Sequence, residues 1–239
     1  MAKSVNIQLH TKGDEQWMSA TDLMSALMLI FMLIALAFMI SAATERDSMK
    51  EERDDIKKVA LKWAEIKEKT YQALIGEFEN DLSKWHAMID RKELIVRFRE
   101  PKILFAVGES SLTPRFTEIL RDFFPRYVRV LGQFSNHIAE IRIEGHTSSE
   151  WNESVSSKQA YFKNLVLSHD RSREVVIFCL STLQHPNSYE WSRQLIVAAG
   201  MSSSRPIMLQ GQEDKEESRR VDFRVRTNAE ERLSEIMAF

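Results

Sequence analysis

The chain has 239 residues, which is enough for one membrane segment and one domain of ordinary size. It carries 33 Lys and Arg against 35 Asp and Glu, a formal net charge of −2. Because nucleic-acid binding needs a concentrated basic surface, this balance argues against a direct nucleic-acid partner. Cys179 is the single cysteine, so an intrachain disulfide is excluded.

An apolar stretch near the N-terminus predicts a transmembrane helix. Residues 23–43 contain no charge, no Pro and no Gly, and about 20 such residues cross a hydrocarbon core of roughly 30 Å as a helix. A cleaved signal peptide is the alternative, because residues 41–43 resemble a cleavage site, but a signal h-region has only about 7–15 residues. We therefore expect a polar arm over residues 1–16 and a retained membrane anchor over residues 17–43.

Asp22 is the anomalous residue of this segment, because it stands at the N-terminal edge of the apolar run. A carboxylate costs roughly 2.5–3.5 kcal/mol to insert into a bilayer, so an acid at this place is a candidate functional group. Two interpretations stay open from the residues alone: an ion-relay site, or the N-cap of a helix that begins at Leu23. Ser25, Ala26 and Leu29 would share the helical face of Asp22.

The charges that flank the segment bear on its orientation. Two cations precede the span, and five follow it closely, Arg46, Lys50, Arg53, Lys57 and Lys58. The positive-inside rule alone would place the C-terminal side in the cytoplasm. This rule weakens where a long domain follows the span, so the flanking charges leave the orientation open.

Residues 44–91 are predicted to form a helical linker. Apolar residues recur at steps of three or four from Ile56 to Ile89, which indicates one helix over residues 44–90. This apolar stripe could pair with a second copy of the chain or pack on the chain's own C-terminal domain. Its spacing of about 3.7 residues, rather than about 3.5, disfavours a regular left-handed coiled coil.

Residues 92–227 predict an α+β domain in β-α-β-α-β order, with a further strand and with helices on one face of the sheet. Thr113 and Pro114 indicate the N-cap and first position of a helix, and Pro125 should kink or split that helix. Strands are expected at residues 94–98, 103–107, 140–144, 195–199 and 218–226, the last with Val221, Phe223 and Val225 inward.

A polar loop should run to about residue 163, and a second helix is expected over residues 165–183. Its predicted buried residues are Leu167, Val175, Val176, Phe178, Cys179 and Leu180. A short helix or turn is expected near residues 189–194, and residues 228–239 are expected to form an amphipathic C-terminal tail.

Four short motifs follow one another on these elements. They are residues 104–114 at the entry to the first helix, Gly145-His146-Thr147 after the next strand, N-x-x-L-S-x-x-R-S-x-x-V from Asn164 to Val175, and Ser218-Arg-Arg-Val-Asp222. In this order they resemble the OmpA-like peptidoglycan-binding domain, which grips the diaminopimelate-type stem peptide of peptidoglycan.

This resemblance implies a peptidoglycan-binding role for five residues: Thr147, Ser148, Asn164, Leu167 and Arg171. Arg171 would pair with a ligand carboxylate, which suits the forked donors of a guanidinium, while Asn164 and Leu167 would line the pocket. Two simpler interpretations compete with these roles. Arg171 could form a surface salt bridge to Asp170 or Glu174, and Leu167 could be a core residue.

One position departs from the family pattern. The family usually follows Gly-x-Thr with an Asp whose carboxylate meets the ligand's ammonium group, whereas this chain has Ser148. Either Glu150 or Glu153 substitutes for this Asp, or the affinity for the cell wall is weakened or altered. His146 is expected to be a structural residue at the strand end and not a metal ligand, because no second His or Cys stands at ligand spacing.

The opening segment, Trp17-x-x-x-x-Asp22-Leu-Met-Ser-Ala-Leu-Met, resembles flagellar stator B subunits (MotB), and residues 191–202 and 216–224 resemble the B subunits of Zorya anti-phage defence systems (ZorB). Both resemblances imply a bacterial inner-membrane protein with a single pass, a cytoplasmic N-terminus and a periplasmic C-terminal domain. They also imply a homodimer bound to peptidoglycan.

Ion relay is the chemistry that these resemblances imply. Two B subunits would lie inside a ring of five A subunits of the MotA or ZorA type, and Asp22 would carry the ion, which we expect to be H⁺. No cofactor, no metal site and no enzymatic activity are expected, because no Ser/His/Asp or metal-ligand set stands out. A flagellar-type stator subunit and a purely structural cell-wall tether without ion flux are the alternatives.

Overall fold

The computed structural model describes residues 12–99, 104–106, 108–152 and 154–228, with side chains from Thr21 onward. The chain divides into two compact units, Met1–Lys57 and Lys58–Phe239. Helix α1 (Lys12–Leu82) supplies the described part of the first unit. Within the described residues, one helix is long and apolar enough to cross a membrane, with a mean hydropathy of 2.8 over an 18-residue window. This confirms the single predicted span.

Helix α1 ends at Leu82, so the prediction of a helix to residue 90 was wrong at its C-terminal end. The chain turns at His86, whose φ is +50°, and then forms strand β1 (Ala87–Asp90). Trp85 and Ile89 are nevertheless buried in the domain core. They matched the helical spacing because the core needs apolar residues there, and not because they lie on a helix.

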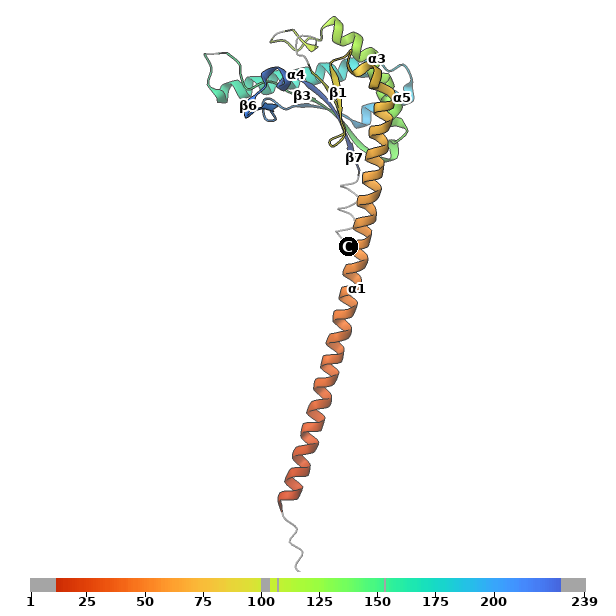
Figure 1. The fold of residues 1–239 in the computed structure, drawn as a ribbon, viewed down its shortest axis with the longest axis vertical. Coiled ribbons are helices and arrows are strands. Elements are labelled where there is room, and N and C mark those ends of the chain that lie inside the picture. Colours follow the sequence, from red (N-terminus) through yellow and green to blue (C-terminus); the bar gives the residue numbers. More distant parts are fainter. Residues whose placement is uncertain (1–11, 100–103, 107, 153, 229–239) are drawn as a thin grey trace, which may run out of the picture. The chain divides into compact units, whose positions relative to one another are not determined.

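The second unit is built on a five-stranded sheet in the order β1-β2-β7-β3-β4 (Figure 1). Only β3 and β4 are parallel, and the other neighbours in this sheet are antiparallel. The strands are β2 (Ile95–Phe98), β3 (Ile138–Gly145), β4 (Ile196–Gly200) and β7 (Val221–Thr227). A separate two-stranded hairpin, β5 (Met208–Leu209) and β6 (Gln212–Glu213), was not predicted.

The described part of this unit also contains the C-terminal part of α1, a 3₁₀ turn at Ser135–His137, and helices α3 (Pro114–Gly132), α4 (Ser157–Ser181), α5 (Pro186–Leu195) and α6 (Lys215–Ser218). Thr113 caps α3 as predicted, and Pro125 does not split that helix. The prediction of a polar loop up to residue 163 was wrong. A capping box between Ser156 and Gln159 starts α4 at Ser157.

One apolar core lies between the sheet and the helices. Val221, Phe223 and Val225 are all buried, as predicted from their alternation. Phe123 of α3 contacts Phe223 with ring centroids 5.1 Å apart, and it also contacts Phe78 of α1 at 5.1 Å. The part of the α1 stripe around Phe78 therefore packs on the chain's own domain.

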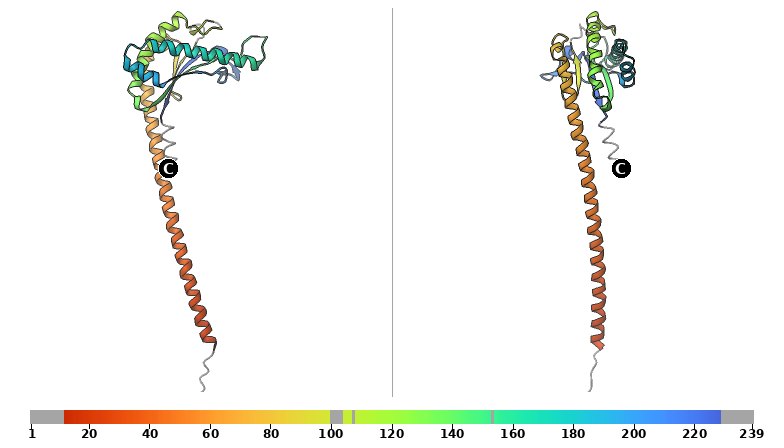
Figure 2. Two further views of the ribbon diagram at one scale, coloured as in Figure 1. Left: turned by 180° about the vertical axis from the view of Figure 1, so that it is seen from behind. Right: turned by 90° about the vertical axis from the view of Figure 1, so that its right-hand side faces the viewer.

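Helix α4 presents a small and polar inner face to the sheet. Figure 2 shows α4 beside α3. Its buried residues are Ala160, Asn164, Ser168, Arg171, Ser172, Val175 and Cys179. The backbones approach closely, because a Cβ atom at Gly145 would collide with the carbonyl of Ser168. The predicted burial holds for Val175 and Cys179, which lie on this inner face, whereas Leu167, Val176, Phe178 and Leu180 lie off it and are only half-buried.

Two further predictions fall partly outside the described residues. In place of a strand at residues 103–107, Phe105 forms an isolated bridge to Leu112, and residues 103 and 107 are not among those described. The predicted C-terminal tail lies outside the described residues beyond Asn228.

Candidate functional site

Asp22 lies inside α1, which begins at Lys12. A helix N-cap must stand at the first turn, so the capping interpretation of Asp22 is wrong. The side chains from Thr21 to Ile40 are exposed all around the helix. A helix that is apolar on every side needs lipid or partner helices to cover it. Asp22 is thus a carboxylate within a helix of membrane-spanning character.

Arg171 is a buried cation for which the described part of the chain supplies no acidic partner. Its side chain is 7% exposed, and its Nε donates to the carbonyl oxygen of Glu109 at 2.8 Å. The guanidinium lies 4.8 Å from the centre of the Phe105 ring. No carboxylate of the described residues lies within ion-pair distance of it. Burial, reinforced by the charge of Arg219, lowers the pKa of Arg171 to about 10, so the group stays cationic at neutral pH.

The surface salt bridge considered for Arg171 does not form. Asp170 and Glu174 instead pair with Arg173, at 3.0 and 3.2 Å. Arg173 is exposed and points away from the seam that α4 makes with the sheet. Because of its position on α4, Arg171 therefore faces inward, and Asp170 and Glu174 pair with Arg173 instead.

The loop after β3 holds the other predicted residues. Thr147 and Ser148 are each 3% exposed, and the hydroxyl of Thr147 has no hydrogen-bond partner in the described structure. Asn164 Nδ2 donates to the carbonyl oxygens of Ser148 and Glu150, at 3.1 and 3.0 Å. Asn164 thus fixes the loop to α4, two helical turns or about 10 Å before Arg171. Leu167 is half-buried between them.

Glu150, one of the two acids expected to replace the missing Asp, is already neutralised. Its carboxylate pairs with Lys215 at 2.5 Å and with Arg219 at 3.3 Å. The hydrogen bond from Lys215 lowers the pKa of Glu150. The other candidate, Glu153, lies outside the described residues.

A carboxylate that the sequence analysis missed reaches the same loop. Glu213 of β6 accepts hydrogen bonds from the backbone N–H of Ser149, at 3.0 and 3.3 Å, and from the hydroxyl of Ser149. The sequence feature that could have indicated its hairpin is the pair Gln210-Gly211. In the structure both residues have a positive φ, at 51° and 82°. Such a pair is typical of a two-residue hairpin turn.

The opposite face of the sheet carries a second buried polar group. Glu144, His146 and Asp222 place one ligand-type atom each within 4.8 Å of one another. Arginines already neutralise the acids, since Arg97 lies 2.8 Å from Asp222 and Arg224 lies 2.9 Å from Glu144. These arginines leave no excess negative charge for a metal ion, which fits the structural role predicted for His146.

The pKa values within this group follow from burial and pairing. Burial alone would raise the pKa of Glu144, but hydrogen bonds from His146 and Arg224 lower it to about 2. Burial lowers the pKa of His146, although its Nε2 lies 3.3 Å from Glu144. The group is therefore a network in which guanidinium groups pair with buried carboxyl groups.

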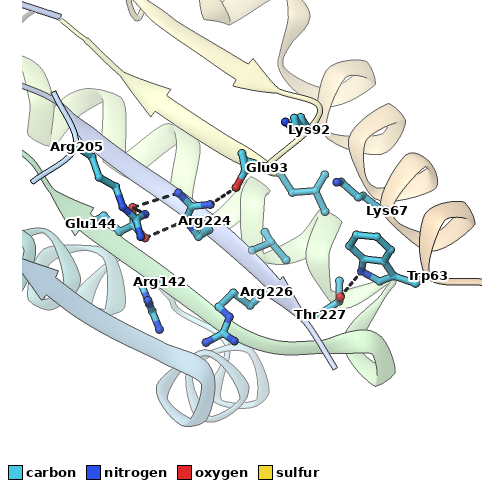
Figure 3. Close-up of a pocket in the computed structure, with 12 residues that line it drawn as sticks. Trp63, Lys67, Lys92, Glu93, Arg142, Glu144, Arg205, Arg224, Arg226 and Thr227 are labelled. Carbon is cyan, nitrogen blue, oxygen red and sulfur yellow. Dashed lines mark hydrogen bonds and ion pairs between the residues drawn. The ribbon is translucent and has the colours of Figure 1, made fainter. Parts of the chain in front are cut away.

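Beside this network lies a basic pocket of about 580 Å³ (Figure 3). Its charged lining residues are Lys67, Lys92, Glu93, Arg142, Glu144, Arg205, Arg224 and Arg226. Figure 3 shows Arg224 between Glu144 and Glu93, at 2.9 and 2.8 Å. Trp63 closes one end through a 2.7 Å hydrogen bond to Thr227.

Comparison with known proteins identifies the family. No family model matches the sequence. The Zorya protein ZorB of Escherichia coli (strain Crooks) is 40% identical over 240 residues, which covers 99% of this chain and 99% of that protein.

Solved structures show weaker similarity. A MotB-like protein of Desulfovibrio vulgaris is 22% identical with a TM-score of 0.44, over 73% of this chain and 94% of that one. The cell wall anchor of the T6SS of Pseudomonas aeruginosa is 18% identical with a TM-score of 0.45, over 64% of this chain and 96% of that one. These structural similarities are too weak to bear on function. The sequence identity is decisive, because it extends over both chains from end to end: the chain belongs to the ZorB family of Zorya proteins.

Proposed function

We propose that this chain is the ion-conducting B subunit of a stator-type rotary motor, that it is anchored to peptidoglycan, and that it acts in anti-phage defence. The observation that carries this proposal is the position of Asp22. It lies ten residues inside α1, at the edge of the segment with membrane-spanning hydropathy. Family membership supports the role in a Zorya system.

The span supplies the ion relay. An ionised carboxylate is costly in a bilayer, and protonation removes that cost. By taking up and releasing H⁺, Asp22 would therefore alternate between two forms. The membrane tolerates the protonated form, whereas the ionised form needs a polar partner. We infer an A subunit of the MotA or ZorA type as that partner, with five A subunits around two copies of this chain by family resemblance.

The C-terminal domain supplies the fixed anchor. Arg171 is buried, cationic and without an acid among the described residues, which suits a site that receives a carboxylate from outside. The stem peptides of peptidoglycan carry such carboxylates. From this wall-binding role we infer that the domain lies in the periplasm and the N-terminus in the cytoplasm, against the count of flanking charges.

Asp22→Asn tests the relay. Asn keeps the size and polarity of the side chain but cannot exchange a proton, so we expect loss of phage protection with normal membrane insertion. Asp47→Asn, on the same helix beyond the apolar run, is the matched control and should retain protection. A purely structural tether would keep full protection in both variants, and that result would rule out the relay.

A further inference from the structure

The face of the sheet opposite α4 concentrates positive charge. Side chains alternate along a strand, so Phe223 and Val225 of β7 pack in the core and Arg224 between them points to the other face. The pocket on that face is lined by six cationic side chains and by two acids, Glu93 and Glu144 (Figure 3). Because the whole chain has a net charge of −2, this excess of cations is a local feature.

The sheet brings two of these arginines directly opposite each other. Arg142 of β3 is the cross-strand partner of Arg224 of β7, and like charges in such a pair destabilise a sheet. Glu140 lies 2.6 Å from Arg142, and Glu144 lies 2.9 Å from Arg224. Since these acids offset the repulsion within the pair, the excess charge of the pocket lies with its remaining cations.

The lysines of the pocket have no acid beside them. Within the described residues, neither Lys67 nor Lys92 forms an ion pair, and Lys67 lies over the Trp63 ring at 4.9 Å from its centre. Arg205 is about half exposed and lies 3.8 Å from Glu144, which already accepts a hydrogen bond from the Nε of an arginine on β7. These three cations can therefore engage a ligand without first breaking a close ion pair.

The walls of the pocket are held in place by contacts between distant elements. The Nε1 of Trp63 donates to the hydroxyl of Thr227 at 2.7 Å, which joins α1 to β7. Leu94 has a φ of +49°, which is unusual for a bulky residue, and its carbonyl oxygen accepts the N–H of Val225 at 3.1 Å. The turn that carries Lys92 is thus fixed beside β7, and backbone strain of this kind is concentrated at functional sites.

We propose that this pocket is an anion site for a phosphate-bearing ligand, with Lys67, Lys92 and Arg205 as its contacts. Its volume of about 580 Å³ lies within the range of about 300–1,000 Å³ that is typical of ligand pockets. A phosphate group carries a charge of about −1.5 to −2 near neutral pH, so one group offsets most of the charge of these three cations.

The residue types suit this ligand. Lysines bind phosphate as point charges, and an arginine offers two parallel donors to its oxygens. The pocket lies on the face of the sheet away from Arg171, so the inference does not depend on the proposed wall-binding role.

The test is a calorimetric titration of inorganic pyrophosphate into the full chain in micelles of a non-ionic detergent. We expect saturable binding that weakens as salt is raised, because salt screens exposed charges. Lys67→Gln/Lys92→Gln removes both lysine charges and keeps polar side chains at these positions. A hydrogen bond to a charged group contributes enough for about a tenfold change in Kd, so this double variant should bind about tenfold more weakly.

Lys158→Gln/Lys163→Gln is the matched control. Both lysines belong to α4, and Lys163 lies over the Trp151 ring at 5.6 Å from its centre, much as Lys67 lies over that of Trp63. This control removes the same net charge from another part of the domain and should bind pyrophosphate like wild type.

Three results would overturn the proposal. The first is a wild-type protein that does not bind pyrophosphate, and the second is a Lys67→Gln/Lys92→Gln variant that binds it as tightly as wild type. The third is an equal loss of affinity in both double variants, which would reflect overall charge and not a site.

Vesicles distinguish two sources of the phosphate group. The full chain in phosphatidylcholine nanodiscs is mixed with vesicles of phosphatidylglycerol, and co-flotation is measured against vesicles of phosphatidylcholine. If wild type associates with phosphatidylglycerol and Lys67→Gln/Lys92→Gln does not, the ligand is a lipid headgroup. If the two proteins differ only toward pyrophosphate, the ligand is a soluble phosphate compound.

Discussion

The two sides of the sheet bury arginines in opposite electrostatic surroundings. On the side of α4, Arg171 is 7% exposed and meets a carbonyl group and an aromatic ring but no acid within the described structure. On the other side, Arg220 is 5% exposed and lies 3.2 Å from the buried carboxylate of Asp222. Arg97 approaches the same carboxylate at 2.8 Å.

This difference separates a paired network within the fold from a buried arginine for which we propose a ligand-binding role. A buried charge costs several kcal/mol unless it is paired, so a fold gains nothing by leaving one unpaired. The network around Asp222 meets that requirement internally. Arg171 has no acidic partner among the described residues, as the proposed binding of an external carboxylate would require. By this criterion Arg224 in the basic pocket of Figure 3 belongs with the network, because Glu144 and Glu93 already engage it.

Removal of the acid shared by the network should have the largest effect on stability. Asp222→Ala leaves Arg97 and Arg220 near one another without their carboxylate, and breaking a buried pair costs roughly 3–5 kcal/mol. We expect a loss of this size in the free energy of unfolding, measured by denaturant titration of the full chain in detergent micelles.

The control for this variant removes an exposed acid from a pair of similar geometry. Glu190 lies 2.7 Å from Arg193, and both side chains are about half exposed. Surface pairs contribute about 0–1 kcal/mol, so Glu190→Ala should stay within that range. Equal losses of unfolding free energy in the two variants would show that burial does not increase the contribution of the network to stability.

The second-largest expected effect is a loss of stability at low pH. The pKa of Glu144 is lowered from an ordinary 4.5 to about 2 in the folded protein, so the folded state binds fewer protons than the unfolded state between these values. The stability contributed by Glu144 is therefore complete above about pH 5 and is lost as the pH falls toward 2. At 1.36 kcal/mol per pKa unit the loss is roughly 3 kcal/mol.

Glu144→Gln isolates this contribution. The variant should be less stable than wild type at pH 7, and the gap should close as the pH falls from 5 to 2. His146 also loses stability toward acid, because burial lowers its pKa, but its loss begins nearer pH 6.5. A constant difference between the two proteins over the lower range would show that the pKa of Glu144 is not depressed.

The sequence alone predicted those features whose signal lies within a single element. Alternation located Val221, Phe223 and Val225 in the core, and the pair Thr113-Pro114 located the start of α3. The motif around Arg171 placed that residue on a helix near the 147–150 loop. Each of these predictions depends on the spacing of residues within one element, which is visible in a single sequence.

Features that depend on contacts between distant elements were missed. The inner face of α4 is polar and small because the sheet approaches it at Gly145, so hydrophobicity did not mark it. Trp85 and Ile89 followed the helical spacing although the chain turns between them. Glu213 became a candidate only when the hairpin brought it to Ser149, a residue 64 positions earlier.

The smallest stability change, and the most informative one, is expected for Arg171. Arg171→Leu replaces an unpaired buried cation by an apolar side chain, so the free energy of unfolding should change by less than about 1 kcal/mol or should rise. Binding to native sacculi should nevertheless fall, because the forked donors for a carboxylate are gone. Arg173→Leu, two residues along the helix, removes an exposed arginine with two acids beside it and should leave binding intact. A stability loss as large as that of Asp222→Ala would show instead that Arg171 is held for the fold, and the contrast between the two sides of the sheet would then disappear.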